Sequence, residues 1–188
     1  ADVFASARRS PESLIPEIEA IDGVLAVETR IIGDAILDVD GVDVSVTGHI
    51  LSLPQNGAPR LNVPILQSGS FPSPLATSEV VVNAPFALAN NLAVGDTFHA
   101  NLNGQKRPLT IVGTALTPEF IYTIGPGAMM PDNKTFGIIM MPERAAAAVF
   151  DMTGAFNDVA IKLTAGTTPQ MVIDRLDPLL EPYGGLGA

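Results

Sequence analysis

The 188-residue chain has no cysteine and no tryptophan, and it has half as many basic residues as acidic ones, 10 against 20. The absence of cysteine excludes disulfides, thiolate nucleophiles and cysteine-based metal or iron–sulfur sites. A formal net charge of −10 repels a nucleic-acid backbone, and the sequence contains no stripe of Lys and Arg to offset it. A nucleic-acid partner and an anionic membrane surface are therefore both disfavoured.

Long apolar runs are also missing, although hydrophobic residues make up 47% of the chain and charged residues only 16%. The best candidates, residues 136–141 and 145–150, are far shorter than the ~20 residues that cross a bilayer. This composition favours a folded domain with a large apolar core over a disordered segment. The first residues lack the apolar region of a signal peptide, and we expect the sequence to be a fragment of a longer protein.

Catalytic motifs are absent from the sequence. It contains neither a G-x-S-x-G nucleophile elbow nor a G-x-x-x-x-G-K-[ST] phosphate loop. His49 and His99 are the only histidines, and they lie in separate predicted strands. They would form a metal or catalytic pair only if those strands meet, and a surface position for each is favoured. We therefore expect no catalytic residues and no cofactor.

An acidic segment, Asp38, Asp40 and Asp43 with Gly41, superficially resembles a calcium-binding loop. An EF-hand loop needs a bidentate glutamate at its twelfth position, and His49 stands there instead. The acidic tip of a hairpin is the favoured interpretation, so no metal site is expected.

Periodicity and turn residues predict a mixture of helices and strands. The expected helices cover residues 13–21, 83–90, 142–150 and 168–180, with Ser13, Asn83 and Thr168 as N-caps. The expected strands cover residues 24–39, 42–53, 79–83, 96–102, 106–115, 119–123, 136–141 and 158–163. Asp40–Gly41 is predicted to form a type I′ turn and Asn103–Gly104 a second tight turn. Because strands and helices do not alternate strictly, the predicted fold class is α+β.

Two stretches stand out from this pattern. Residues 54–74 are rich in Pro and Gly and are the best candidate for a boundary between subdomains. Residues 119–130 place large apolar side chains around a Gly/Pro loop. If that loop is exposed, it is the first place to seek a partner or cargo contact, whereas the alternative is that these side chains are core. The residues singled out for this contact are Phe120, Tyr122, Met129 and Met130.

The segment 117–142, TPEFIYTIGPGAMMPDNKTFGIIMMP, resembles the extracytoplasmic domain of FtsX/MacB-type permeases, the membrane subunits of a class of ABC transporters. Residues 18–24 and residues 79–97, EVVVNAPFALANNLAVGDT, are similar to the corresponding segments of that family. The likeness therefore covers most of the chain. It implies a porter-like α+β subdomain formed by residues 1–60 with 151–188, and an inserted, mostly β subdomain formed by residues 61–150.

The resemblance also implies a function. The domain would sit on the extracytoplasmic side of a bacterial cytoplasmic membrane, attached to transmembrane helices of the same permease. A separate cytoplasmic ATPase subunit and a second permease copy or homologous domain would be its partners. It would couple ATP hydrolysis to export or extraction of an amphipathic cargo (lipoprotein, lipid or peptide), or regulate an envelope protein. A free-standing periplasmic binding or adaptor module is the alternative, and a histidine-dependent hydrolase is a distant third.

Overall fold

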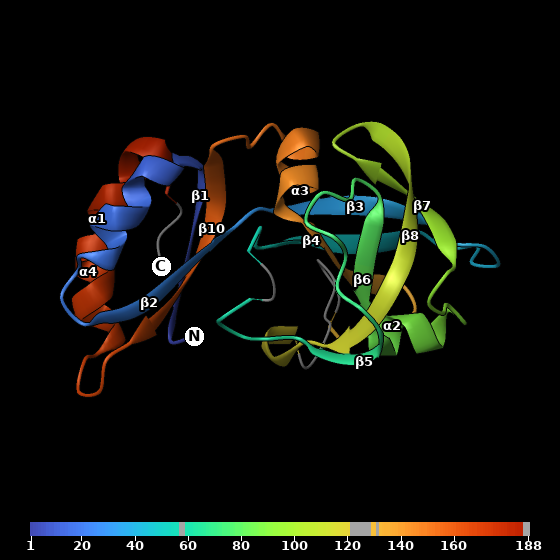
Figure 1. Ribbon diagram of the computed structural model, residues 1–188, viewed down its shortest axis with the longest axis horizontal. Coiled ribbons are helices and arrows are strands. Elements are labelled where there is room, and N and C mark those ends of the chain that lie inside the picture. Colours follow the sequence, from blue (N-terminus) through green and yellow to red (C-terminus); the bar gives the residue numbers. More distant parts are fainter. Residues whose placement is uncertain (57–58, 121–128, 131, 186–188) are drawn as a thin grey trace. The chain divides into compact units, whose positions relative to one another are not determined.

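The structure is a computed structural model that describes residues 1–56, 59–120, 129–130 and 132–185 (Figure 1). The chain divides into two compact units. Unit 1 consists of residues 1–31 and 152–188, and unit 2 consists of residues 32–151. Unit 1 is thus built from both ends of the chain, and unit 2 is one continuous insertion. Both mix helix and sheet, so the expected α+β fold class is confirmed.

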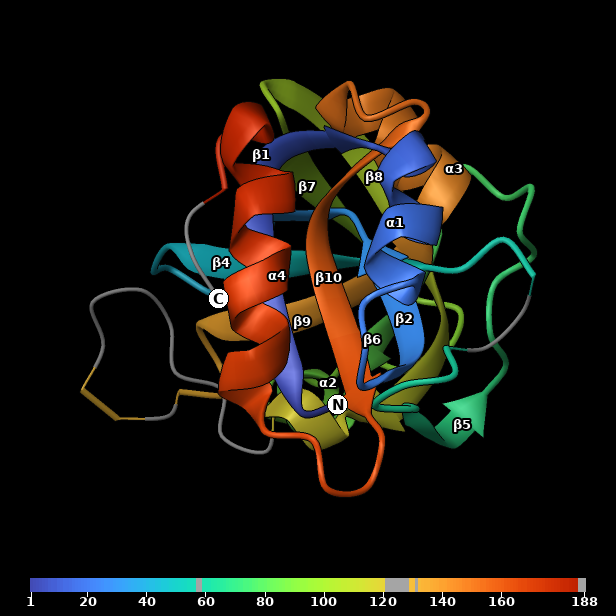
Figure 2. The same cartoon turned by 90° about the vertical axis from the view of Figure 1, so that its left-hand side faces the viewer.

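Unit 1 is a three-stranded antiparallel sheet covered by helices on one face. The sheet has the order β1-β10-β2, so strands from opposite ends of the sequence pair directly. Helices α1 and α4 lie side by side over the sheet (Figure 2). The elements of unit 1 are β1 (Val3–Pro11), α1 (Ile15–Glu19), β2 (Val24–Arg30), β10 (Ala155–Leu163) and α4 (Pro169–Leu180), with 3₁₀ turns at Glu12–Leu14 and Glu181–Tyr183.

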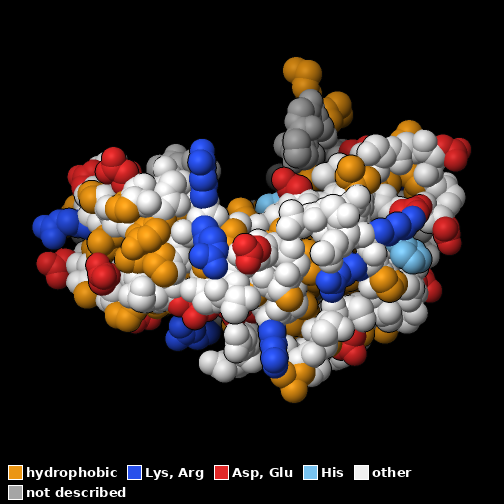
Figure 3. Space-filling view, turned by 90° about the horizontal axis from the view of Figure 1, so that it is seen from above, with side chains coloured by type: hydrophobic (Ala, Val, Ile, Leu, Met, Phe, Trp, Pro, Cys, Tyr) orange, Lys and Arg blue, Asp and Glu red, His pale blue; other side chains and the backbone are white. Residues whose placement is uncertain are grey.

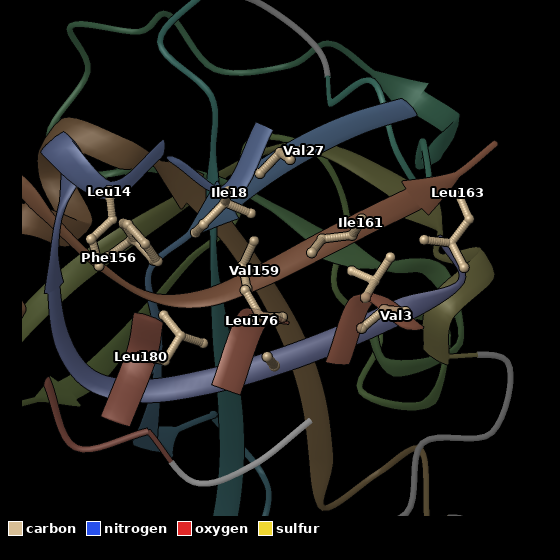
Figure 4. Close-up of a cluster of buried hydrophobic side chains, with 12 residues drawn as sticks. Val3, Leu14, Ile18, Val27, Phe156, Val159, Ile161, Leu163, Leu176 and Leu180 are labelled. Carbon is tan, nitrogen blue, oxygen red and sulfur yellow. The ribbon is translucent and has the colours of Figure 1, made fainter. Parts of the chain in front are cut away.

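The core of unit 1 forms where alternate strand residues meet the apolar stripes of the two helices. Successive side chains of a strand point to opposite faces, so Val159 and Ile161 of β10 both face the helices. Leu176 and Leu180, four residues apart on α4, point back toward them (Figure 4). The buried members of this cluster are Val3, Ala5, Leu14, Ile18, Val27, Phe156, Val159, Ile161, Leu163, Val172, Leu176 and Leu180.

Unit 2 is a closed sheet with one extra strand. Its strand order is β5-β8-β6-β9-β4-β3-β7, and β7 also pairs with β8, which closes a barrel. The long strand β8 pairs with β7 along its first half and with β5 along its last residues, while β6 takes its other edge. The strands are β3 (Ile32–Asp38), β4 (Val46–Leu53), β5 (Ile65–Gly69), β6 (Glu79–Asn83), β7 (Thr97–Leu102), β8 (Gln105–Leu116) and β9 (Phe136–Pro142).

Inward-facing side chains fill this barrel, as expected for a small one. On β7 the residues Phe98, Ala100 and Leu102 are buried while their neighbours are exposed, which is the alternation predicted for that strand. β9 is buried along its whole length, because β4 and β6 flank it and helices cover its outer side. The helices are α2 (Ala84–Ala89) and α3 (Glu143–Phe150), and a 3₁₀ turn spans Pro118–Phe120.

Several expected element boundaries differ from the observed ones. Strands β1 and β5 were not expected, and the first α-helix begins at Ile15 after a 3₁₀ turn, with no side-chain cap from Ser13. The described start of the expected strand 119–123 is a 3₁₀ turn, and residues 121–123 lie outside the described residues. Helix α4 ends at Leu180 as expected, but Thr168 makes no side-chain capping bond.

The two predicted tight turns have different outcomes. Asn103 and Gly104 both have positive φ, +49° and +80°, as a type I′ hairpin requires. At the other turn only Gly41 has positive φ, and the N–H of Val42 donates to the carbonyl of Val39, so this turn is not type I′. Strand β4 consequently begins at Val46 rather than at Val42.

The first boundary between the units lies at residue 31/32, whereas the sequence suggested residue 60. Residues 32–53 form β3 and β4, which hydrogen-bond to β7 and β9 of the barrel and therefore belong to unit 2. The Pro/Gly-rich segment 54–74 is internal to unit 2, because its strand β5 pairs with β8. The second boundary, at residue 151/152, lies one residue from the expected one.

Candidate functional site

The residues expected to form a contact loop do not share one environment. Met129 and Met130 are 97% and 75% exposed, so the described part of the loop carries large apolar side chains in solvent. Phe120 is half-buried and packs against an apolar cluster that includes Leu51 and Met140. Tyr122 lies outside the described residues.

The two histidines are not brought together. His49 is on β4 and His99 is on β7, and β3 lies between those strands. His49 Nδ1 is 3.3 Å from Asp34 Oδ1, and its ring centroid is 5.6 Å from that of Phe120. His99 is opposite Asp38, four residues farther along β3. No shared histidine site therefore results.

The acidic segment does not assemble into an ion-binding cluster either. Asp38 Oδ2 of β3 is 3.0 Å from Lys106 Nζ of β8, an exposed ion pair that spans the intervening strand β7. Among the residues that the structure describes, no group of three or more His, Asp or Glu side chains is placed to hold a metal ion.

An apolar groove lies beside α2 in unit 2, and we call it the α2 groove. Its cavity volume is about 840 Å³. In Figure 1 α2 lies next to the ends of β5 and β8, and the groove is formed between these elements. The lining residues are Gln67, Ser68, Ala84, Pro85, Ala87, Leu88, Ala89, Leu92, Ala93, Val94, Thr114, Leu116 and Asn133.

A second cavity of about 320 Å³ extends the groove toward Phe120. The two cavities share Pro85, Leu116 and Asn133 as lining residues, so they meet at that point. The second cavity is lined by Ile65, Asn83, Pro85, Leu116, Thr117, Pro118, Phe120 and Asn133. Together they form one elongated concave surface.

The floor of the groove follows from the pairing of β5 with β8. Ile65 is opposite Leu116, and Ser68 is opposite Thr114, so these four side chains occupy one face of the two-stranded ribbon. The intervening residues Leu66 and Ala115 point to the other face, where Ala115 belongs to the buried apolar cluster of unit 2 and Leu66 packs against it. The ribbon therefore has a core face and a groove face.

The wall of the groove is held in place by asparagine side chains. Asn83, the residue before α2, accepts a 2.8 Å hydrogen bond from the N–H of Ile138, rather than capping the helix as the sequence predicted. Asn90, just after α2, donates to the carbonyls of Phe86 and Lys134. These bonds fix both ends of a helix that is too short to be stable alone.

The turn that carries Asn133 is stabilised by Asp132. The Thr135 hydroxyl donates to this carboxylate at 2.6 Å and the N–H of Lys134 donates at 2.9 Å. Hydrogen bonds donated to a carboxylate stabilise its charged form. The bond from the Thr135 hydroxyl, which has the larger effect, and the bond from the Lys134 N–H therefore lower the pKa of Asp132 below its ordinary value of 3.8. This turn places Asn133 where the two cavities meet.

The α2 groove lacks charged side chains in the part of the chain that the structure describes. Among the described residues that line its two cavities, none is Asp, Glu, Lys, Arg or His. On the face of the molecule seen in Figure 3, in contrast, acidic and basic side chains are scattered among uncharged surface. None of the helices in the described ranges is both long enough and apolar enough to cross a membrane.

No protein-family model matches the sequence, and no curated protein sequence matches it either. Solved structures do match. The extracellular domain of the noncanonical ABC-type transporter YknZ from Gram-positive bacteria superposes with a TM-score of 0.58 at 12% identity, covering 96% of this chain and 89% of that one. The periplasmic region of MacB from Actinobacillus actinomycetemcomitans gives a TM-score of 0.57 at 13% identity, covering 94% and 77%.

A domain from Porphyromonas gingivalis described as part of a permease gives a TM-score of 0.50 at 14% identity, covering 97% of this chain and 84% of that one. The chain thus has the α+β fold of extracellular and periplasmic domains of ABC transporter permeases. The resemblance drawn from residues 117–142 is confirmed at the level of the fold.

The α2 groove was not found from the sequence. Its lining comes from three separate stretches, residues 65–68, 84–94 and 114–118, with Asn83, Phe120 and Asn133. Most of these residues are small or apolar and have no recognisable spacing. The only available signal was the segment 84–94, in which the apolar residues Leu88, Leu92 and Val94 lie around a short predicted helix.

Proposed function

We propose that this chain is the non-catalytic extracytoplasmic domain of an ABC transporter permease in a bacterial cytoplasmic membrane. The observation that carries the proposal is the likeness to the YknZ and MacB domains over 94–96% of the chain. Transmembrane helices of the same permease and a separate cytoplasmic ATPase are its proposed partners, with a second permease copy or homologous domain beside it.

The two-unit architecture supports a mechanical role. Both terminal segments belong to unit 1, where β1 pairs with β10 and the N–H of Arg8 donates to the carbonyl of Gly184. A displacement of flanking membrane helices would therefore act on unit 1 through both ends of the chain. Unit 2 connects to unit 1 at two positions only, residues 31/32 and 151/152. In this proposal ATP-driven motion reaches unit 2 through those two connections.

We assign unit 2 the contact with the cargo or the envelope partner. The exposed Met129 and Met130 and the uncharged α2 groove are the apolar surfaces that support this role. Methionine side chains adapt to partners of varied shape, which suits a surface that captures amphipathic molecules. Phe120 at the end of the groove and Tyr122 complete the proposed contact set.

The experiment that tests this function examines the intact gene product in its membrane. We expect apolar runs of ~20 residues to flank the domain, and the protein to fractionate with the cytoplasmic membrane together with an ATPase subunit. A cleavable signal peptide before the domain, followed by a stop codon after it, would replace the permease with a free-standing periplasmic binding or adaptor module.

A further inference from the structure

We propose that the α2 groove binds the hydrocarbon chain of an uncharged, lipid-like molecule. The groove has a shape that suits an extended, flexible ligand. The cavities of about 840 Å³ and about 320 Å³ are joined at Pro85 and Leu116, so the concave surface is long rather than compact. The larger cavity already lies within the size range of small-molecule sites, roughly 300–1,000 Å³. A flexible chain can follow both cavities, whereas a compact ligand would fill only one.

The second argument is the chemistry of the lining. Leu88 is 82% exposed on the helix wall, and Ile65, Val94 and Leu116 are also exposed around the groove. Exposed apolar side chains that surround a cavity are typical of a site that is covered by an apolar ligand. The protein carries a net charge of −10, yet no charged side chain is found among the described residues that line this surface. The described lining therefore offers no ion pair to a charged ligand.

Three of the six polar residues in the described lining already use side-chain groups within the protein. The hydroxyls of Ser68 and Thr114 are 2.6 Å apart and hydrogen-bond to each other. The side-chain oxygen of Asn83 accepts the N–H of Ile138. The other three are Gln67, Thr117 and Asn133. An extended peptide lying in the groove would bring one N–H and one C=O with each residue, and buried backbone groups without partners are costly. A hydrocarbon chain makes no such demand.

The lining also differs from a protein-binding surface. Interfaces with other proteins are enriched in Tyr, Trp, Phe, Met and Arg, and Trp, Tyr and Arg are the commonest sources of binding energy. Here ten of the eighteen described lining residues are Ala, Leu, Pro or Val, six are Ser, Thr, Asn or Gln, and Phe120 is the one aromatic side chain among them. Small aliphatic residues allow close contact along a chain of methylene groups but provide no anchor for a protein partner.

The inference names the cargo class of the proposed transport function and rests on that function for its biological meaning. The binding itself does not depend on it. If the groove binds lipid but no membrane helices flank the domain, the permease proposal fails and the groove stands. If the domain is flanked by membrane helices but the groove binds no lipid, the permease proposal stands and the hydrocarbon assignment fails.

The test titrates the 188-residue protein with monoacylglycerols of increasing chain length, each below its critical micelle concentration. Methyl resonances of Leu, Val and Ile report the site. We expect saturable 1:1 binding with shifts at Leu88, Val94 and Leu116. Affinity should rise about fourfold per added methylene until the groove is filled and then level off. Shifts spread over the whole surface, or affinity that does not depend on chain length, would overturn the proposal.

Two matched variants locate the binding. Leu88→Glu places a carboxylate in the groove, and Leu75→Glu places one at a leucine that is 71% exposed but does not line either cavity. Because both side chains lie largely in solvent, both variants should fold. We expect Leu88→Glu to weaken binding at least tenfold and Leu75→Glu to leave it unchanged. Equal effects of the two would contradict the assignment.

Two further measurements test other occupants of the groove. If sedimentation of the unliganded protein shows a dimer that Leu88→Glu dissociates, the occupant is a second copy of the chain. An amphipathic helical peptide that displaces the monoacylglycerol and binds more tightly would make the groove a protein-docking surface. Either result would overturn the hydrocarbon assignment.

Discussion

The side-chain Oδ1 of Asn83 accepts a 2.8 Å hydrogen bond from the backbone N–H of Ile138, deep in unit 2. Strands β6 and β9 pair through Val81 and Val82, and Asn83 continues the contact with its side chain at the point where the backbone turns into α2. A single amide thus links the barrel to the helix that forms the wall of the groove.

Asn83→Ala should therefore destabilise the protein by about 1–3 kcal/mol, because it leaves a buried N–H without an acceptor. Denaturant unfolding of the variant measures this loss. Asn101→Ala, at an exposed position of β7, is the matched control and should change the free energy of unfolding by less than about 0.5 kcal/mol. Equal stabilities of the two variants would show that the Asn83 bond contributes nothing.

Gly137 of β9 lies against the ring of Phe86, the fully buried aromatic residue of α2. A Cβ at residue 137 would be 2.8 Å from the nearest ring carbon, closer than real contacts allow. Gly137→Ala should cost about 1–3 kcal/mol, since the ring has to move within a packed core.

A double-mutant cycle separates this clash from other effects of the substitution. Phe86→Leu removes part of the ring, so Gly137→Ala should cost less in that background than in the native protein. We expect an interaction energy of about 0.5–3 kcal/mol in the cycle. Additive effects of the two substitutions would rule out the steric explanation.

These contacts show why the sequence predicted some features and missed others. The hairpin at Asn103–Gly104 depends on two adjacent residues that both tolerate positive φ, so a local pattern was sufficient. At Asp40–Gly41 a similar pattern misled, because only Gly41 has positive φ and the following residues do not begin a strand. Turn residues indicate a bend, but strand pairing decides its type.

Long-range pairing also explains the missed strand and the misplaced boundary. β1 contains Arg8 and Arg9, and its buried residues Ala5 and Ala7 give only a weak apolar signal; it is a strand because β10, from the far end of the chain, pairs with it. The Pro/Gly-rich segment around Pro64 resembled a linker, yet it leads into β5, the extra strand that pairs with β8 at the edge of the barrel. The partner strands β10 and β8 were both expected, but their pairing with β1 and β5 is not visible from the local sequence. The α2 groove is created by the same long-range contacts.

Two carboxylates make the stability of the fold depend on pH in the acid range. The Leu163 N–H, followed by the Lys162 side chain, lowers the pKa of Asp2, and the Thr135 hydroxyl followed by the Lys134 N–H lowers that of Asp132. Their pKa values in the folded protein lie below the ordinary value of 3.8. Each carboxylate therefore stabilises the fold fully above that value, and the contribution is lost as pH falls through the folded pKa.

We expect the melting temperature to decline below pH ~4 and Asp132→Asn to flatten part of that decline. The variant should also melt at a lower temperature than the native protein at neutral pH, because a neutral amide accepts the Thr135 and Lys134 bonds more weakly. Asp43→Asn, a change at an exposed position, serves as the control and should follow the native profile. A melting profile of Asp132→Asn that is parallel to the native one would contradict the linkage.

The proposed contact residues Met129 and Met130 can be examined without knowing the partner. Hydrogen peroxide oxidises methionine to the sulfoxide at a rate that follows the exposure of the sulfur. Met129 and Met130 are 97% and 75% exposed, whereas Met140 and Met141 in β9 are fully buried. Peptide mapping by mass spectrometry should therefore find the first pair oxidised well before the second, with the fold retained.

Membrane or partner extracts that contain the true contact should then protect that pair. Met171, which is exposed on α4 of unit 1, provides an internal reference, because its oxidation should be unaffected if the contact is confined to unit 2. Protection of Met129 and Met130 with unchanged oxidation of Met171 would support the contact surface. Oxidation of all three at unchanged rates in the assembled complex would remove this loop from the contact surface and leave the α2 groove as the remaining apolar candidate of unit 2.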